Sequence, residues 1–317
     1  MVSRVLLPAI PLDRATAPAN LPQAVIAPAS PALPPAPPLL DGFEPLRLVA
    51  AGGLCDVWQV RDRLTGNVYA LKQLSAAWVH DATAGQLLRN EAAAGLAVRS
   101  GHVVRVFRAD LDTEPPRLLV EWLAGVSLED ALQRAGRLDV PRAVWIARQC
   151  VAGLIDLAAA GFSHGDVKPG NILLSDDGAA RLIDLGFACR HDGADSDRDR
   201  GGQSLLGTPE YLAPETMARG RLSPISLDVY SLGVTLFRML AGRLPFHDAT
   251  VAGVLRLGRQ ARPPRLERFG IEAPARLFDL VGRMLAKQPL RRPSCLRTLW
   301  RELVKIELHV MASIESA

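Results

Sequence analysis

The sequence has few cysteines and no long apolar run, and both absences exclude a class of protein. Its four cysteines show neither Cys-x-x-Cys spacing nor a neighbouring histidine cluster; they are Cys55, Cys150, Cys189 and Cys295. This pattern excludes a zinc site and a disulfide framework, and it fits the reducing cytoplasm. The longest apolar helix candidate, residues 143–161, contains Arg148, Gln149 and Asp156, so we expect no membrane span.

The sequence also lacks a dominant charge of one sign. It has 37 Lys and Arg against 33 Asp and Glu, a formal net charge of +4 over 317 residues. The basic residues are scattered along the chain, so we do not expect nucleic acid as a partner, although the pI is about 9.1. With 49% hydrophobic residues, the length suits one two-lobed domain or two small ones.

Residues 1–40 differ in composition from the rest of the chain. Proline and alanine dominate, ending in Pro34-Pro35-Ala36-Pro37-Pro38. This composition favours extended polyproline II and cannot form a core, so we predict a disordered tail. The tail is interpreted as a linker, with docking to the proline groove of a partner as the alternative. Prolines interrupt the apolar run near the N-terminus, so we do not expect a signal peptide.

Two polar strings flank a predicted β-hairpin in the middle of the chain. Residues 164–171 read His-Gly-Asp-Val-Lys-Pro-Gly-Asn, and Asp184 begins Asp-Leu-Gly. Between them, Asp177-Gly178 predicts a tight type I′ turn, which would place Asn171 opposite Asp184. Opposed residues have Cβ atoms about 4.5–5.5 Å apart, so an amide oxygen and a carboxylate would meet in a site suited to Mg²⁺. Asp166 would remain free to act on a proton.

These strings resemble the catalytic loop and the metal-binding triplet of eukaryotic-type (Hanks-type) serine/threonine protein kinases, including bacterial members. Val68 to Lys72 resembles the strand that carries the family's phosphate-pairing lysine. Residues 207–215, Gly-Thr-Pro-Glu-Tyr-Leu-Ala-Pro-Glu, resemble the segment that receives the substrate peptide. They are the most specific single string. A lysine two residues after Asp166 is typical of Ser/Thr rather than tyrosine kinases.

The resemblance implies an α+β, bilobal fold. A kinase domain would span residues 41–310, with an antiparallel-sheet N-lobe at about 43–123, a mostly helical C-lobe at about 124–307 and a short tail at 311–317. Residues 121–123 would form the hinge. Helical patterns are expected at 84–98, 143–161, 227–241, 274–286 and 295–307. Ser127 and Asp139 are predicted to cap the starts of two helices.

The resemblance also implies a reaction, transfer of the γ-phosphoryl group of Mg·ATP to Ser or Thr hydroxyls of proteins, with autophosphorylation and with Mn²⁺ as an alternative metal. Asp166 would accept the proton, Lys168 would neutralise the migrating group, and Asn171 and Asp184 would hold the metal. The expected ATP-binding residues are Ala50, Gly52, Gly53, Val57, Ala70, Lys72, Glu91, Glu121 and Leu123. The expected structural residues of the peptide-binding region are Thr208, Glu215, Asp228 and Arg292.

The glycine-rich loop departs from the family pattern Gly-x-Gly-x-x-Gly-x-Val. Ala50 and Cys55 replace the first and third glycines, and Gly52 remains at the second. Because glycine permits close approach to phosphate, these changes would stiffen the loop and weaken ATP binding. We consider Cys55 either a thiol over the nucleotide or a plain small-residue substitution.

Two other classes fit part of this sequence. A small-molecule kinase of the aminoglycoside type shares His-Gly-Asp followed by Asn, but it lacks a string like residues 207–215. A pseudokinase, acting as a binding or scaffold module, fits the altered loop and also Gly95, which would weaken the helix that carries Glu91.

Gly165 predicts how the activation loop is regulated. Many kinases carry an arginine at this position, and that arginine pairs with a phosphorylated loop. Glycine offers no such partner, so we expect activity without phosphorylation of Ser196 or Ser204.

Overall fold

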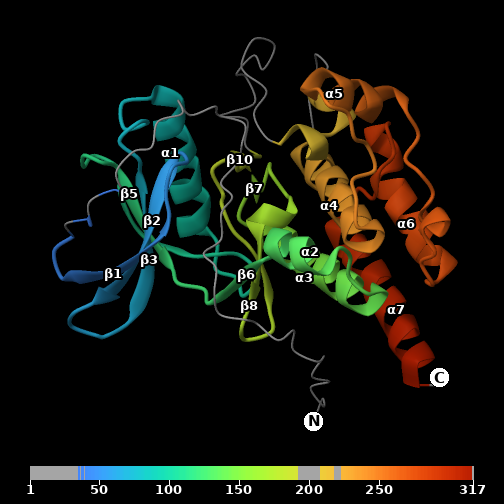
Figure 1. Ribbon diagram of the computed structural model, residues 1–317, viewed down its shortest axis with the longest axis horizontal. Helices are drawn as coiled ribbons and strands as arrows, with labels where there is room; N and C mark the ends of the chain where they lie inside the picture. The colour runs from blue at the N-terminus through green and yellow to red at the C-terminus, as the bar shows by residue number, and fades with distance from the viewer. Residues whose placement is uncertain (1–34, 36, 39, 192–207, 218–222, 316–317) are drawn as a thin grey trace.

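Two lobes lie side by side in the computed structural model, which describes Pro35, Pro37, Pro38 and residues 40–191, 208–217 and 223–315 (Figure 1). The first lobe is a sheet with one helix against it, and the second is mostly helical. The predicted α+β, bilobal architecture is therefore confirmed. Among the described residues, no helix has both the length and the apolar character that a membrane crossing needs.

A five-stranded antiparallel sheet forms the N-lobe, in the order β1-β2-β3-β5-β4. The strands are β1 (Phe43–Ala50), β2 (Cys55–Asp62), β3 (Val68–Leu74), β4 (Val106–Asp110) and β5 (Arg117–Glu121). Helix α1 (Ala82–Ala97) packs its Leu88 and Ala92 against one face of the sheet. Asp81 begins this helix, because its carboxylate accepts a hydrogen bond from the Ala84 N–H at 2.7 Å.

The other face of the N-lobe sheet is covered by residues that precede β1. Leu40 is buried against Trp58 and Leu71, and Pro38 is also buried. The packed part of the chain therefore begins a few residues before the predicted domain boundary at 41. The rest of the predicted tail lies outside the described residues.

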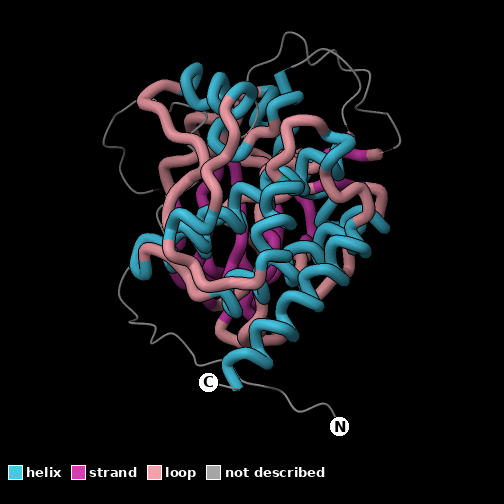
Figure 2. Tube along the Cα trace, turned by 90° about the vertical axis from the view of Figure 1, so that its right-hand side faces the viewer, coloured by secondary structure: helices cyan, strands magenta, loops and turns pink. Residues whose placement is uncertain are grey.

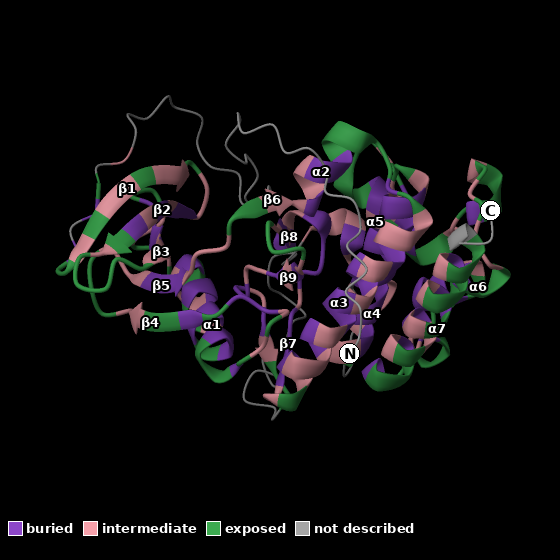
Figure 3. Ribbon diagram, turned by 90° about the horizontal axis from the view of Figure 1, so that it is seen from below, coloured by how far each residue is buried: buried purple, intermediate pink, exposed green. Residues whose placement is uncertain are grey.

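Helices make up most of the C-lobe, and Figure 2 views the molecule from their side, with the strands behind them. They are α2 (Leu128–Ala135), α3 (Val140–Ala159), α4 (Pro224–Ala241), α5 (Val251–Gln260), α6 (Ala275–Met284) and α7 (Leu296–Glu315). Short strands line the side that faces the N-lobe: β6 (Gly125–Ser127), β7 (Phe162–Ser163), β8 (Ile172–Ser175), β9 (Ala180–Leu182) and β10 (Cys189–Arg190). Helices α3 and α4 carry long stretches of buried residues and form the centre of this lobe (Figure 3).

Both predicted helix caps are confirmed. The Ser127 hydroxyl accepts a hydrogen bond from the Asp130 N–H at 3.0 Å, and the Asp139 carboxylate accepts one from the Arg142 N–H at 2.8 Å. The last helix is longer than predicted and continues to Glu315, so most of the predicted tail at 311–317 is helical. Its buried stripe of Leu303, Ile306 and Val310 keeps the helical period past residue 307.

The predicted register of the hairpin is wrong by one residue. Leu173 pairs with Arg181, and the Ile183 N–H donates to the Asn171 carbonyl at 2.9 Å, so Asn171 lies opposite Ile183 rather than Asp184. The turn has three residues instead of two, with Gly178 at a φ of 81°. Asp177 stabilises this turn, because its carboxylate accepts hydrogen bonds from the Ser175 hydroxyl and the Ala179 N–H.

Gly95 is a close-packing residue of α1 rather than a sign of a weakened lobe. A Cβ atom at this position would lie 2.2 Å from Cγ2 of Val106 on β4. The absence of a side chain therefore lets the helix lie directly on the sheet, and the weakening that we expected from this glycine is not supported.

We predict that Gly95→Ala destabilises the protein by about 1–3 kcal/mol, because the added methyl overpacks the contact with Val106. Urea unfolding followed by circular dichroism measures the change. The control is Gly282→Ala on α6, where a Cβ atom has nothing within 4 Å. It should be neutral or stabilising by up to about 1 kcal/mol. Equal stability of both variants would contradict the close-packing role.

Candidate active site

A lysine on β3 joins two acidic groups from different parts of the chain. The Lys72 Nζ lies 2.6 Å from Glu91 Oε2 on α1 and 3.2 Å from Asp184 Oδ1 after β9. These side chains are 13%, 4% and 17% exposed, so water screens the pairs only weakly. The Lys72 side chain therefore ties the N-lobe sheet and its helix to the segment that follows the hairpin.

Burial and neighbouring charges shift the pKa values of these three side chains. Burial alone would lower the pKa of Lys72, but the carboxylates of Asp184 and Glu91 outweigh it and hold that pKa above its usual value. Burial would raise the pKa of Asp184, yet Lys72 keeps it below the usual range. Burial raises the pKa of Glu91 despite the attraction of Lys72. Lys72 is thus a fixed cation, and Asp184 is an ionised carboxylate suited to a metal.

A second cluster surrounds Asp166, which is 3% exposed. Its Oδ2 accepts hydrogen bonds from the Asn171 amide at 2.9 Å and lies 2.8 Å from the Lys168 Nζ. Its Oδ1 accepts a longer bond from the Thr208 N–H at 3.4 Å. The Lys168 Nζ also donates to the Thr208 hydroxyl at 2.5 Å. The structure thus brings together a carboxylate, a cation and the start of the segment expected to receive a peptide.

Asp228 on α4 fixes the loop that carries this cluster. Its two carboxylate oxygens accept hydrogen bonds from the His164 and Gly165 N–H groups, both at 2.8 Å. Burial raises the pKa of Asp228, although His164 and the two N–H donors oppose the shift. Gly165 has a φ of 82°, and a Cβ atom there would lie 2.2 Å from the Phe187 carbonyl oxygen. Both the backbone conformation and the space therefore require glycine at this position.

Asn171 and Asp184 each keep an oxygen that could bind a divalent metal, although the strand register does not place them opposite each other. The Asn171 amide nitrogen donates to the Asp166 carbonyl and carboxylate, both at 2.9 Å, which leaves its amide oxygen as the ligand atom. Asp184 has a φ of 62°, which turns the chain away from β9. Lys72 binds Oδ1 of Asp184, so Oδ2 is the available carboxylate oxygen. Two hard oxygen donors of this kind fit Mg²⁺.

The expected nucleotide residues of the N-lobe lie along one face of its sheet. Val57 pairs with Lys72 across β2 and β3, and Ala70 is two residues before Lys72, so all three side chains share a face. Ala50 ends β1 opposite Val57, and Gly52 turns the loop at a φ of 84°. Gly53 is held by its carbonyl, which accepts a hydrogen bond from the Ser75 hydroxyl at 2.9 Å. The loop has lost two of the three glycines of the family pattern, but it still forms a turn between two paired strands.

Cys55 is enclosed in the N-lobe core, on the sheet face that also carries Val57 and Lys72. Its side chain is fully buried in the N-lobe core with Leu74 and Leu88, and this burial raises the pKa of its thiol to about 12. The burial therefore favours the interpretation of Cys55 as a small core residue, and the charges of Lys72 and Asp184 act on its thiol from the same side of the sheet. The next residue, Asp56, is also buried, and its carboxylate accepts a hydrogen bond from the Gly52 backbone. This bond adds a second restraint on the loop.

The hinge residue Glu121 uses its side chain to brace the lobes. Its Oε1 lies 2.8 Å from Arg181 Nη1 on β9, and its backbone N–H donates to the Arg105 carbonyl at 2.8 Å. Only its backbone carbonyl is therefore left for the adenine contact that we expected. Leu123 packs against the N-lobe core.

The segment expected to receive a peptide is anchored at both ends. Arg292 makes a bidentate ion pair with Glu215, at 2.6 and 2.7 Å. Thr208 forms the other end through its bonds to Lys168 and Asp166. Between them, two 3₁₀ turns span Pro209–Tyr211 and Pro214–Met217.

Sequence reasoning missed a third anchor of this segment, Arg238 on α4. Its guanidinium donates to the Tyr211 hydroxyl at 2.7 Å and to both carboxylate oxygens of Glu129 on α2, at 2.5 and 2.6 Å. Burial alone would lower the pKa of Arg238, but the bonds to Glu129 and Tyr211 raise it. A lone arginine in an otherwise apolar helical stretch was the available signal for this role.

Comparison with known proteins gives one family match and several relatives. The family model described as "Protein kinase domain" matches residues 43–304. The serine/threonine-protein kinase drp72 of Corynebacterium efficiens is 32% identical over 250 residues, which cover 77% of this chain and 47% of the relative. PknL of Mycobacterium tuberculosis is 32% identical over an alignment that covers 77% of this chain and 60% of the relative's length. PrkC of Bacillus subtilis is 26% identical over an alignment that covers 79% of this chain and 38% of the relative's length. The chain thus spans less than two thirds of these relatives.

We predict that Cys55 resists alkylation by N-ethylmaleimide in the native protein, with or without Mg·ATP, because a buried neutral thiol is a poor nucleophile. The internal control is exposed Cys295, where hydrogen bonds from the Thr298 hydroxyl and nearby N–H groups lower the pKa. Cys295 should be labelled first. Peptide mass spectrometry measures both sites, and labelling of Cys55 that Mg·ATP blocks would place its thiol at the nucleotide instead.

Proposed function

The chain belongs to the protein kinase domain family, and from this premise we propose that it transfers the γ-phosphoryl group of metal-bound ATP to serine or threonine hydroxyls of protein substrates. The observation that carries the proposal is the contact of the buried Asp166 and Lys168 with Thr208, near the start of the segment expected to receive a peptide. The names of the relatives support the Ser/Thr class.

Asp166 is the group that would handle the proton of the substrate hydroxyl. Its Oδ2 is held by Asn171 and Lys168 and its Oδ1 by the Thr208 N–H, so its orientation is fixed before a substrate arrives. Phosphoryl transfer depends on such positioning and on charge neutralisation more than on covalent help. Lys168 would offset the negative charge of the transferred group, and the Thr208 hydroxyl keeps its ammonium close to Asp166.

Lys72 is the group that would bind the α- and β-phosphates of the nucleotide. Glu91 fixes its position, and ATP would compete with Asp184 for its ammonium group. A divalent cation supplies charge neutralisation between the phosphates when it is bound. We propose Mg²⁺, with Mn²⁺ as an alternative, held by Asn171 and Asp184. The remaining proposed ATP-binding residues are Ala50, Gly52, Gly53, Val57, Ala70, Glu121 and Leu123.

Substrates and location belong to the proposal as well. Protein substrates are implied by the kinase domain, and the free state of all four cysteines in the structure fits a reducing compartment such as the cytoplasm. The proline-groove partner of the N-terminal tail stays a prediction, because that tail lies mostly outside the described residues.

The two rival classes lose most of their support. The anchored segment at residues 208–215 and the family match do not fit a small-molecule kinase. The scaffold alternative draws on Gly95 and on the altered glycine loop. Gly95 is explained by close packing, and the loop keeps its turn at Gly52. The Lys72, Glu91 and Asp184 cluster is complete, which a nucleotide-free module does not need.

We predict that Asp166→Asn lowers phosphoryl transfer by about 10²–10⁴-fold, because it removes the proton acceptor while keeping the shape of the side chain. Transfer of radiolabelled phosphate to the protein and to a generic protein substrate measures activity, and calorimetry measures Mg·ATP binding, which should be unchanged. Asp176→Asn, at an exposed turn, is the matched control. Transfer at the wild-type rate by Asp166→Asn would overturn the assignment.

We also predict that activity does not require phosphorylation of the activation loop. Gly165 offers no cation for a phosphate, and residues 192–207, which contain Ser196 and Ser204, lie outside the described residues. The double variant Ser196→Ala/Ser204→Ala and phosphatase-treated protein should keep most of their turnover in the same transfer assay. A loss of more than about tenfold, equivalent to roughly 1.4 kcal/mol of barrier, would contradict this prediction.

A further inference from the structure

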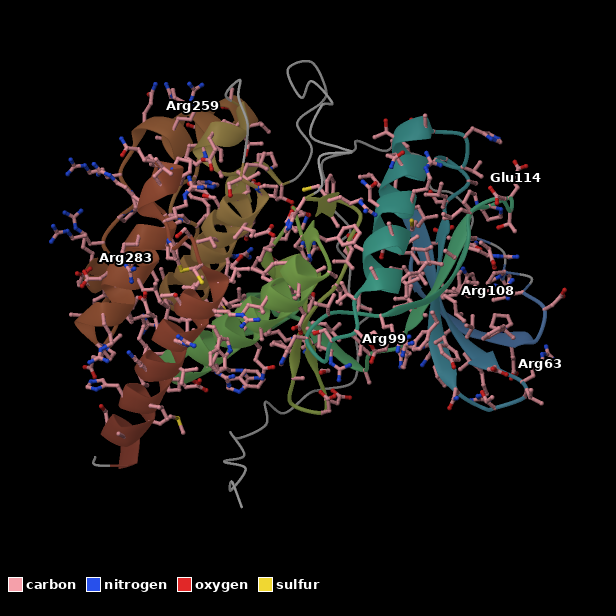
Figure 4. The ribbon with its side chains drawn as sticks, turned by 180° about the vertical axis from the view of Figure 1, so that it is seen from behind. Arg63, Arg99, Arg108, Glu114, Arg259 and Arg283 are labelled. Atoms are coloured by element: carbon pink, nitrogen blue, oxygen red, sulfur yellow. The ribbon has the colours of Figure 1, made fainter. Side chains whose placement is uncertain are left out.

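A polar side chain on α1 reaches the backbone that follows the proposed metal ligand Asp184. The Asn90 amide nitrogen donates a hydrogen bond to the Gly186 carbonyl oxygen at 3.2 Å, across 96 positions of sequence. In Figure 4, the teal helix α1 stands on the side of the N-lobe that faces the C-lobe, whereas Arg108 and Glu114 mark the far edge of that lobe. The Asn90 bond therefore joins one lobe to the other.

The surrounding hydrogen bonds give the Asn90 amide one orientation. Gln86, one turn earlier on α1, donates its amide N–H to Asn90 Oδ1 at 2.8 Å. The oxygen of the Asn90 amide is thus occupied by a donor, and its nitrogen is directed at Gly186. Gly186 is buried, so its carbonyl oxygen needs a partner inside the protein. Asn90 supplies that partner.

Gly186 also packs closely against the same helix. A Cβ atom at Gly186 would lie 3.6 Å from both the Cβ and the carbonyl oxygen of Leu87 on α1. The chain after Asp184 is therefore in direct contact with the helix. Asn90 adds a directional bond to this contact, and that bond fixes the position of the backbone along α1.

The conformation of Asp184 depends on the bonds made by its neighbours. Its φ of 62° is uncommon for a residue with a side chain, and such a conformation persists only where surrounding contacts hold it. Before it, the Ile183 carbonyl oxygen lies 3.2 Å from His164 Nε2. After it, Asn90 holds the Gly186 carbonyl. The backbone is thus fixed on both sides of the carboxylate.

A second link between α1 and Asp184 runs through Lys72, and a nucleotide would compete for it. Glu91, the residue after Asn90, is joined to Asp184 through the Lys72 ammonium group. In the proposed reaction, the phosphates of ATP draw this ammonium group toward themselves. The Asn90 bond makes no use of Lys72, so it stays in place when the nucleotide binds.

We propose that Asn90 is a positioning residue of the metal site. It holds the backbone after Asp184 against α1, and it thereby keeps the Asp184 carboxylate in place for a divalent cation while Lys72 binds the phosphates. This inference rests on the proposed kinase function, and it adds to the nucleotide site a residue that touches neither the nucleotide nor the metal.

The first measurement is the binding of ATP to the full chain by calorimetry, once with Mg²⁺ and once with EDTA. We expect Asn90→Ala to weaken Mg·ATP binding by about three- to tenfold, the effect of losing one hydrogen bond, and to leave the metal-free affinity unchanged. Asn90→Asp keeps the shape but lacks the donor that faces Gly186, so it should lose at least as much. The matched control is Thr83→Ala, at an exposed position of α1, which should bind like the wild type.

The second measurement needs neither nucleotide nor metal. Hydrogen exchange followed by mass spectrometry should show faster exchange in peptides that cover residues 184–188 of Asn90→Ala, and wild-type exchange in Thr83→Ala. Urea unfolding checks that the fold is kept, because the higher helix propensity of alanine offsets the lost bond. Unchanged exchange of residues 184–188 in Asn90→Ala would overturn the inference.

The binding data separate this inference from the kinase function itself. Unchanged Mg·ATP affinity in Asn90→Ala overturns the positioning role, even where the wild type transfers phosphoryl groups. An affinity loss of equal size with and without Mg²⁺ also overturns it, because such a loss reports a general effect on the fold. A wild type whose Mg·ATP binding depends on Asn90, but which transfers no phosphoryl group to a protein substrate, overturns the kinase function and keeps the positioning role.

Discussion

The buried carboxylate of Asp228 is the constraint on which the catalytic loop depends. It sits in α4, the most enclosed helix of the C-lobe, and it accepts the N–H groups of His164 and Gly165. A carboxylate buried in this way is costly unless its hydrogen bonds are made, and each bond to a charged group contributes about 1.5–3 kcal/mol. The loop is therefore held in one conformation, with Gly165 at a positive φ and Asp166 directed at Lys168 and Asn171.

Ion pairs then connect this fixed loop to the N-lobe. Lys72 joins α1 to the segment after β9, and Glu121 joins the hinge to β9 through Arg181. Buried or half-buried pairs of this kind add little net stability, because desolvation offsets their attraction. Their contribution here is geometric. They set the distance between the proposed phosphate-binding lysine and the proposed metal ligands, which a reaction governed by positioning requires.

Packing explains two residues that suggested a weakened N-lobe. Cys55 fills the N-lobe core, and Gly95 lets α1 lie close to β4. The Gly52 turn and the bond from its backbone to Asp56 restrain a loop that has lost two glycines. In the C-lobe, Tyr211, Arg238 and Glu129 tie the segment expected to receive a peptide to α2 and α4.

Features that depend on neighbouring residues could be predicted from the sequence. The caps at Ser127 and Asp139 and the buried stripes of the helices follow from spacings of three or four positions, because hydrogen bonds and side chains at those spacings meet within one element. The strings at 164–171 and 207–215 indicated the fold because their residue types and order resemble those of one family.

Features that depend on packing between distant segments could not be predicted from the sequence. The hairpin register follows from a three-residue turn that the Asp177 side chain stabilises, and Cys55 is buried by the helix packed against its strand. The hydrogen-bonded ion pair between Arg238 and Glu129 joins residues that are 109 positions apart in the sequence. A pattern of residues states which side chains are polar or small, but not what lies against them. Contacts between distant segments form only when the chain packs, and they fix the register, burial and ion pairs of this protein.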